Sequence, residues 1–200
     1  MSSKDVVLGR IRSALGSGVA APEIPRDYRR GSDKPDFDLL VERLADYKAV
    51  VHRVGAEAIP AVILQIVGSG TVVVPPGLPT DWLPAEVEAV VDDGLDADRI
   101  AAADGVVTGA AVAIAETGTI VLDASPDQGR RIITLLPDLH ICVLRPEQVV
   151  ASVPEAVARL DPRRPLTWIS GPSATSDIEL NRVEGVHGPR NLHVILLEAQ

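Results

Sequence analysis

The chain contains 200 residues, of which 46% are hydrophobic and 2% are aromatic, and its formal net charge is −9. A chain of this length can bury enough surface to form a single domain, and its core must be built from aliphatic side chains. Such cores suit buried strands and the helices that cover them, so we expect an α/β fold rather than a small β-barrel. The negative charge repels a phosphate backbone, which makes nucleic acid an unfavourable partner.

The single cysteine, Cys142, lies in the apolar segment 139–144, where we expect a small buried side chain rather than a reactive thiol. One cysteine excludes an intrachain disulfide and an iron–sulfur cluster held by the cysteines of this chain alone. Residues 1–16 lack an uninterrupted apolar stretch, and no later apolar run reaches the roughly 20 residues of a membrane span. We therefore expect no membrane span and a cytoplasmic location.

Two segments precede the predicted domain. Apolar residues recur at helical spacing behind Ser2 and Ser3, which predicts an amphipathic helix that ends at Gly16. Residues 17–35 are rich in glycine, proline and charge, which predicts an extended arm, and this arm fits a poorly ordered linker and a partner-binding segment equally well. We divide the chain into an N-terminal helix and arm, residues 1–35, and one domain, residues 36–200.

Helices and strands are expected to alternate after residue 35. The predicted helices span 37–44, 57–67 and 96–103, and the predicted strands span 49–54, 71–75, 88–91, 111–115, 119–123, 139–144, 166–170 and 192–197. This alternation predicts a mainly parallel sheet with helices on both faces, and the close spacing of strands after Val106 predicts a local antiparallel insertion. A further helix is predicted at Ser125, with Pro126 at its first position and Gln128 closing a capping box.

The sequence matches none of the cofactor-binding or metal-binding motifs considered. The segment Gly68–Ser69–Gly70 lacks the third glycine of a dinucleotide fingerprint and precedes a predicted strand instead of a helix. The four histidines show no metal-ligand spacing, so we expect no metal and no cofactor bound by this chain. His140 and His193 are predicted to be ordinary sheet residues. His187 lies in a tight turn, where it either presents its imidazole to a cleft or faces solvent.

Glu116 lies between two predicted apolar strands and is followed by Thr117 and Gly118. An unpaired carboxylate among apolar strands is costly, so Glu116 requires a partner or a function. One hypothesis makes Glu116 a catalytic base, a nucleophile or a ligand anchor, with Thr117 and Gly118 beside the ligand. The alternative is a turn residue paired with an arginine or a backbone N–H. We expect any small-molecule site to form where the loops 115–119 and 170–181 converge.

Arginines supply the candidate counter-charges for an anionic ligand. Arg130 and Arg131 fall in the first turns of the helix predicted at Ser125, where exposed amides and guanidinium groups can bind a carboxylate or a phosphate. Arg130 is the stronger candidate, whereas Arg131 suits a solvated basic patch. Arg190, at the end of the turn that contains His187, is a second candidate counter-charge.

The segment 170–179 leaves a predicted strand and concentrates hydroxyl groups and glycine in a loop. Ser176 and Glu179 form a capping box, so Ser176 has a structural role of its own. Ser173 and Thr175 have no such local role, and we expect them to bind the anionic ligand.

Four segments resemble the LUD-domain family: Ala-Glu-Thr-Gly-Thr at 115–119, Leu-Pro-Asp-Leu-His at 136–140, Ser-Gly-Pro-Ser-Ala-Thr-Ser-Asp-Ile-Glu at 170–179 and Gly-Val-His-Gly-Pro at 185–189. The resemblance covers roughly Phe37 to Glu198. It implies a single α/β domain with the fold of sugar-phosphate isomerases and CoA-transferases (NagB/RpiA/CoA-transferase-like).

The resemblance also implies a role in oxidising L-lactate to pyruvate beside an iron–sulfur protein and a cysteine-rich protein. This chain would then be a non-redox subunit or an assembly factor, with the clusters in its partners. The alternative is a stand-alone enzyme that acts on a small anionic metabolite, with Glu116 as base or nucleophile. In CoA-transferases of the related fold a Glu followed by Asn-Gly is the nucleophile, and Glu116–Thr117–Gly118 is similar except at Thr117.

Overall fold

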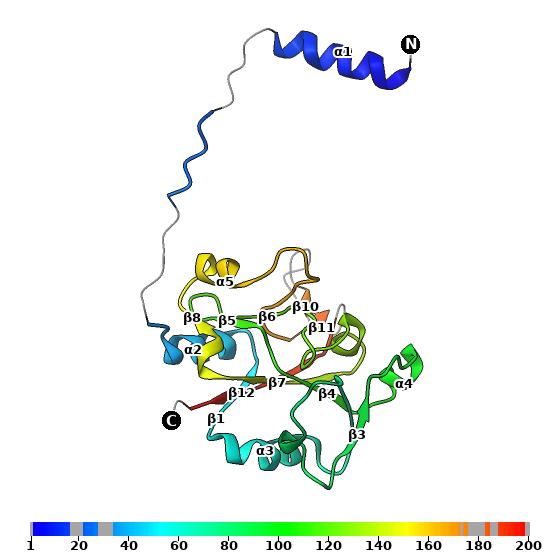
Figure 1. Cartoon of the computed structure of the whole chain (residues 1–200), viewed down its shortest axis with the longest axis vertical. Helices are drawn as coiled ribbons and strands as arrows, with labels where there is room; N and C mark the ends of the chain where they lie inside the picture. Colours follow the sequence, from blue (N-terminus) through cyan, green and yellow to red (C-terminus); the bar gives the residue numbers. More distant parts are fainter. Residues whose placement is uncertain are drawn as a thin grey trace.

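The computed structural model describes residues 2–16, 22–27, 34–172, 174–175, 183–184 and 188–198. A six-stranded parallel sheet forms the centre of the domain (Figure 1). Its strands, in spatial order, are β1 (Val50–Val54), β12 (Asn191–Leu197), β7 (Leu139–Leu144), β4 (Gly105–Thr108), β2 (Thr71–Val74) and β3 (Glu88–Val91). Valine, isoleucine and leucine fill the inner strands because both faces of a covered parallel sheet are buried. The predicted parallel sheet is therefore confirmed.

A second, four-stranded sheet packs on one face of the first. Its order is β8 (Val149–Val150), β5 (Val112–Ile114), β6 (Thr119–Leu122) and β9 (Thr167–Ile169). The pairs β5–β6 and β6–β9 are antiparallel, and the pair β5–β8 is parallel. The antiparallel insertion expected after Val106 is thus confirmed, although it forms a separate sheet and not a branch of the first.

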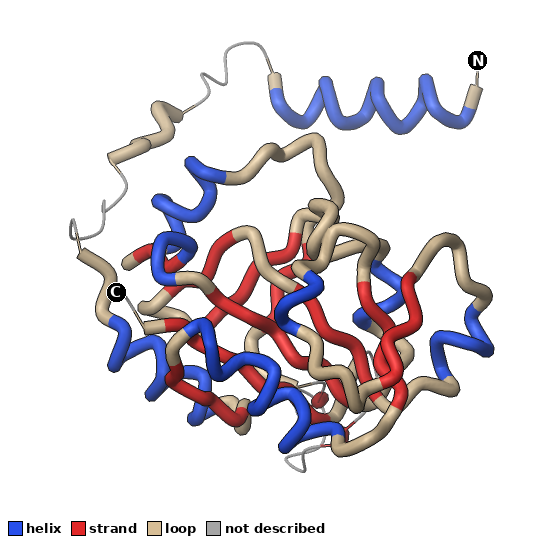
Figure 2. Tube along the Cα trace, turned by 60° about the horizontal axis from the view of Figure 1, so that its bottom comes forward, coloured by secondary structure: helices blue, strands red, loops and turns tan. Residues whose placement is uncertain are grey.

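Helices close the outer faces of this two-sheet arrangement (Figures 1 and 2). Helix α3 (Ile59–Val67) packs its buried Ile59 and Ile63 on one face of the parallel sheet. Helix α2 (Phe37–Asp46) packs Leu40 on the other face, beside the second sheet. Helix α5 (Val153–Arg159) covers the far side of the second sheet. The layers therefore run α3, parallel sheet, second sheet with α2, and α5.

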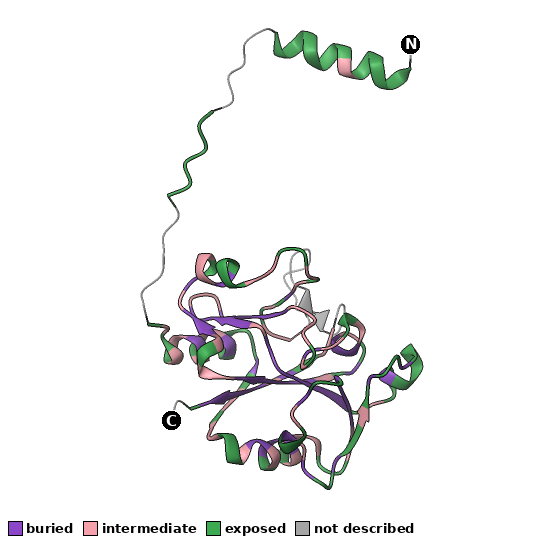
Figure 3. Cartoon of the chain, in the orientation of Figure 1, coloured by how far each residue is buried: buried purple, intermediate pink, exposed green. Residues whose placement is uncertain are grey.

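The remaining elements are short or peripheral. Helix α1 (Ser3–Leu15) begins with Ser2 as its cap and ends at Gly16, as predicted, and it has no buried residue (Figure 3). Helix α4 (Ala97–Ala101) lies beside the edge strand β3, and β10 (Ala174–Thr175) pairs with β11 (Val183–Glu184) in a two-stranded sheet. In the part of the chain described, no helix has the length and apolar character needed to cross a membrane.

The helix predicted at Ser125 is wrong. Turns occupy residues 125–128, and a single 3-10 turn, η3 (Arg131–Thr134), follows. The carboxamide of Gln128 accepts from the backbone N–H of Asp123 and does not close a capping box on Ser125. Gly129 has a positive φ of 71°, which interrupts helical backbone. Strands β4, β8, β10 and β11 and helix α5 were not predicted from the sequence; β4 spans Gly105–Thr108, inside the parallel sheet.

Candidate functional site

The carboxyl ends of β2 and β4, where many α/β proteins bind ligands, are covered by the chain itself. The N–H of Gly77 donates to the carbonyl of Pro126 at 2.9 Å, and the N–H of Gly109 donates to the carbonyl of Asp127 at 2.8 Å. A Cβ on Gly109 would lie 2.5 Å from a carboxylate oxygen of Asp127. The turn that replaces the predicted helix therefore fills this crevice, and the candidate site lies elsewhere.

The two loops expected to converge do meet in the described residues. The Thr119 and Ser170 hydroxyl oxygens lie 2.9 Å apart, where β6 and β9 pair through Ile120 and Ile169. Thr119 is buried, so this hydrogen bond joins the two loops within the protein. Ser173 and residues 176–182 lie outside the described residues.

The Glu116–Gly118 turn has a packing role. Gly118 has φ of 59°, and an added Cβ would approach the Arg43 Cβ on helix α2 to 2.6 Å. The hydroxyl of Thr117 donates to that of Thr119 at 2.8 Å, and the N–H of Glu116 donates to the Ala151 carbonyl at 3.2 Å. Glycine and threonine at these positions are therefore explained by close packing and by hydrogen bonds inside the protein.

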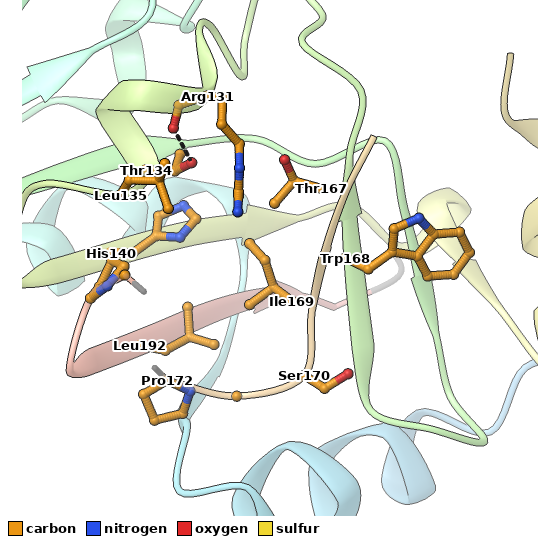
Figure 4. Close-up of a pocket in the computed structure, with 13 residues that line it drawn as sticks. Arg131, Thr134, Leu135, His140, Thr167, Trp168, Ile169, Ser170, Pro172 and Leu192 are labelled. Atoms are coloured by element: carbon orange, nitrogen blue, oxygen red, sulfur yellow. Dashed lines mark hydrogen bonds between the residues drawn. The ribbon is translucent and has the colours of Figure 1, made fainter. Parts of the chain in front are cut away.

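A pocket of about 310 Å³ lies beside Ser170, at the amino ends of β7 and β12 (Figure 4). It is lined by Arg131, Thr134, Leu135, His140, Thr167, Trp168, Ile169, Ser170, Gly171, Pro172, Gly188, Pro189 and Leu192. The turn η3, both sheets and the segments flanking β9 and β12 all contribute to it. Glu116 is not among the lining residues.

The neighbouring arginines Arg130 and Arg131 have different environments. Arg130 bonds both carboxylate oxygens of Asp92, at 2.8 and 2.5 Å, and the carbonyl of Leu95 at 2.9 Å. This contact holds the pKa of the Asp92 carboxyl below its usual range, because hydrogen bonds from Arg130 favour the charged form. The geometry thus gives Arg130, a predicted counter-charge, a structural contact.

Arg131 extends from η3 into the pocket, between the side chains of His140 and Thr167 (Figure 4). Among the described residues no carboxylate pairs with its guanidinium group. The backbone carbonyl of Arg131 accepts a hydrogen bond from the Thr134 hydroxyl at 3.1 Å, which fixes the turn that aims the side chain. Arg131 is exposed, in agreement with the solvated basic residue predicted from the sequence, and it also lines the pocket.

His140 is a buried polar residue at the base of the pocket. Its exposed fraction is 1%, and Nε2 lies 2.8 Å from the Thr108 hydroxyl oxygen on the adjacent strand β4. Burial lowers the pKa of His140 to about 4, so the imidazole is neutral near pH 7. No described residue forms a hydrogen bond with Nδ1. His140 is therefore more than the ordinary sheet residue that the sequence predicts.

The rest of the lining combines hydroxyl groups with apolar walls. Thr134 and Thr167 are buried, while Ile169, Pro172 and Leu192 supply apolar surface. The side chain of Trp168 points away from the other residues drawn in Figure 4. A single guanidinium group, a neutral imidazole and hydroxyl groups beside apolar side chains are suited to bind a small anion.

Arg190, a further predicted site residue, follows the lining residue Pro189 in the chain. Arg190 forms a bidentate pair with Asp138, at 2.6 and 2.8 Å, which ties the starts of β12 and β7 together. Only the backbone of Thr175, in β10, is described. His187 lies outside the described residues, between β11 and the lining residue Gly188.

The other described cysteine and histidine side chains are buried or paired with a neighbouring side chain. Cys142 is fully buried, and burial raises the pKa of its thiol to about 12. His52 Nε2 and His193 Nδ1 lie 3.1 Å apart on the neighbouring strands β1 and β12. Across the described ranges, no group of three or more histidine, cysteine, aspartate or glutamate residues could hold a metal ion.

Sequence reasoning identified Ser170 and its loop but missed most of the polar residues of the pocket. His140 had one available signal, a histidine inside an otherwise apolar strand, which demands a buried partner. Arg131 was a candidate anion-binding arginine but ranked behind Arg130. Thr134 and Thr167 gave no comparable signal, because their orientation depends on how η3 and β9 pack together.

Comparisons with known proteins agree with this architecture. The chain has an α/β fold, and residues 80–197 match the LUD domain. It is 49% identical over 162 residues to lactate utilization protein C of Deinococcus radiodurans, with 78% of this chain and 76% of that protein covered. The chain belongs to the LUD-domain family.

Two further similarities extend this result. Lactate utilization protein C of Bacillus licheniformis is 29% identical over 235 residues, covering 98% of this chain and 96% of the relative. A crystal structure of a DUF162 family protein from Deinococcus radiodurans superposes with a TM-score of 0.71 at 42% identity, covering 80% of this chain and 95% of that one. The similarity to lactate utilization protein C therefore extends over nearly the whole chain.

Proposed function

We propose that this chain is a non-redox subunit or an assembly factor of a system that oxidises L-lactate to pyruvate. The observation that carries the proposal is the similarity to proteins named lactate utilization protein C, at 49% identity in one case and over 98% of the chain in another. The pocket beside Ser170, with one guanidinium group and neutral hydrogen-bonding groups, is compatible with a small organic acid.

In this proposal the electron-carrying groups belong to iron–sulfur partner proteins. Cluster ligation uses several cysteine thiolates, and this chain contributes a single, fully buried cysteine, Cys142. A thiol whose pKa is raised to about 12 stays protonated at neutral pH and is a poor ligand. The partners would supply the redox chemistry, and this chain would contribute binding or assembly.

Reconstitution tests the proposal directly. Purified candidate iron–sulfur subunits would be assayed for lactate-dependent reduction of an artificial electron acceptor, with and without the full chain. We expect the chain to co-isolate with at least one iron–sulfur protein and to be required for full activity. If it never co-isolates and its gene deletion leaves growth on L-lactate intact, the proposal fails.

A stand-alone enzyme built on Glu116 has less support from the geometry. Glu116 lies in the turn packed on α2 and does not line the pocket. We therefore predict that Glu116→Gln retains at least about half of the wild-type activity in the reconstituted assay, because general base catalysis would cost 10²-fold or more. Loss of turnover by two orders of magnitude, with unchanged thermal unfolding, would instead favour a catalytic Glu116.

A further inference from the structure

We propose that the pocket binds a small monocarboxylic acid with an oxygen on the carbon next to the carboxylate. The carboxylate pairs with Arg131, and the second oxygen lies against His140. This inference concerns the ligand class alone and needs no catalytic step.

The charge distribution around Arg131 supports a carboxylate ligand. Seven other arginines of the described domain each contact an aspartate: Arg43 with Asp46, Arg53 with Asp38, Arg130 with Asp92, Arg145 with Asp127, Arg163 with Asp161, Arg164 with Asp123 and Arg190 with Asp138. Arg99 and Arg159 have no acidic partner among the described residues, but neither lines the pocket. Arg131 has no acidic partner among the described residues, although the chain carries a net charge of −9. A guanidinium group binds a carboxylate through two parallel hydrogen bonds, so an acid in the pocket would complete the pairing.

The other polar groups of the pocket indicate a ligand with one negative charge. His140 is neutral near pH 7 because burial lowers its pKa, so Arg131 is the positive charge among the lining side chains. One guanidinium group balances one carboxylate, whereas a phosphate dianion or a dicarboxylate would place a second charge beside neutral groups. Such a charge would lack compensation in a partly buried site.

His140 has a free position for a second ligand oxygen. Its Nε2 faces the Thr108 hydroxyl, and Nδ1 has no hydrogen-bond partner among the described residues. A neutral imidazole can donate or accept at this atom, which suits either a hydroxyl or a carbonyl oxygen on the ligand. Figure 4 places the His140 ring on the same side of the pocket as the Arg131 side chain.

The size and walls of the pocket limit the rest of the ligand. Its volume of about 310 Å³ is at the lower end of the roughly 300–1,000 Å³ typical of ligand pockets. Ile169, Pro172 and Leu192 offer apolar contact for a short alkyl substituent. A 2-hydroxy or 2-oxo acid with a short alkyl group has a carboxylate for Arg131, a second oxygen for His140 and an apolar substituent for the wall of the pocket.

Calorimetric titration of the full chain tests this inference, with L-lactate, pyruvate, propionate and inorganic phosphate as probes. The choice of lactate and pyruvate rests on the proposed function, and propionate lacks only the second oxygen. We expect saturable binding of lactate or pyruvate, with weaker binding of propionate and of phosphate. No binding of either oxygenated acid, or tighter binding of phosphate, would overturn the inference.

Matched arginine variants locate the binding site. We expect Arg131→Gln to weaken lactate or pyruvate binding at least about tenfold, since a charged hydrogen-bonded pair is lost. Arg163→Gln removes the same charge from an exposed arginine with an 88% accessible side chain, and we expect unchanged binding. Equal affinities for Arg131→Gln and wild type would contradict the inference, provided that both proteins unfold at the same temperature.

A histidine variant tests the second oxygen separately. We expect His140→Leu to remove the preference for lactate or pyruvate over propionate while propionate affinity stays constant. If this variant does not fold, His140→Gln, which keeps a group for Thr108, replaces it. A preference that survives either substitution would contradict the role of His140. These binding results are independent of the reconstitution assay, so the ligand class and the proposed function can fail separately.

Discussion

At the scale of single residues, Arg130 and Arg131 illustrate how adjacent identical side chains acquire different roles. Arg130 lies at the start of η3 and bonds Asp92, which is almost fully buried at the end of β3. Arg131 lies one position later and lines the pocket (Figure 4). The local sequence does not distinguish the two arginines. Their different contacts result from the backbone path of the turn.

Removal of the Arg130 side chain is expected to destabilise the fold. In Arg130→Met the buried Asp92 carboxylate loses its charged partner, so we expect a lower free energy of unfolding. Urea unfolding at pH 7 measures the change. Arg163→Met, which breaks an exposed pair with Asp161, is the control and should change stability much less than Arg130→Met. Equal effects of the two substitutions would refute the structural role of Arg130.

His140 is expected to make stability depend on pH in acid. The unfolded chain binds a proton at His140 below its ordinary pKa of 6.5, whereas the folded chain does so only near pH 4. The contribution of His140 to stability is therefore complete above pH 6.5 and is lost as the pH falls toward 4, by roughly 3 kcal/mol. Urea unfolding of wild type and His140→Gln from pH 7.5 to 4.5 checks this. The free energy of unfolding should fall less steeply with decreasing pH in the variant, because the variant lacks the titrating imidazole. Parallel curves for the two proteins would contradict it.

At the scale of elements, the turn between β5 and β6 couples the second sheet to helix α2. Gly118 contacts Arg43 of α2, and Thr119 bonds Ser170 at the end of β9. Gly171, with φ of 83°, approaches Tyr47 at the end of α2 in the same way. The helix therefore holds both loops beside the pocket.

Substitution of Gly118 tests this coupling. Gly118→Ala combines a positive φ with a clash against the backbone of Arg43, and we expect a loss of about 2–3 kcal/mol. Gly68→Ala has a similar φ, 66° against 59°, but nothing lies within 4 Å of the added Cβ, so backbone strain alone opposes it and a smaller loss is expected. Chemical denaturation compares the two variants. If Gly68→Ala costs as much as Gly118→Ala, the contact with α2 is not important for stability.

At the scale of the whole molecule, helix α1 contributes little to the folded domain. It has no buried residue, and Val7, Ile11 and Leu15 are all exposed. Removal of residues 1–27 should therefore change the unfolding free energy of the domain by less than about 1 kcal/mol. Denaturant unfolding of the truncated and full chains measures this. A drop of several kcal/mol would show that α1 packs on the domain in solution.

Much of the architecture could be predicted from the sequence. The parallel strands follow apolar, β-branched runs such as Thr71–Val74, and the meeting of the two loops at Thr119 and Ser170 was expected. The helix at Ser125 was not formed, because Gly77 and Gly109 bind the same segment as a turn over the sheet. Such long-range contacts outweigh a local capping signal.

The pocket could be predicted only in part for the same reason. Ser170 was on the predicted loop, but Arg131 and His140 come from distant segments that fold together at the amino ends of β7 and β12. No spacing rule joins these positions, since their proximity results from the order of the strands. The predicted roles of Ser173 and His187 lie outside the described residues and stay predictions.

The reconstituted lactate assay tests the central proposal most directly. Lactate-dependent reduction of an electron acceptor by the iron–sulfur partners would be measured with the full chain present and with it omitted. We predict that the rate with all subunits falls toward background when this chain is left out. An equal rate with and without the chain would contradict its role in lactate oxidation.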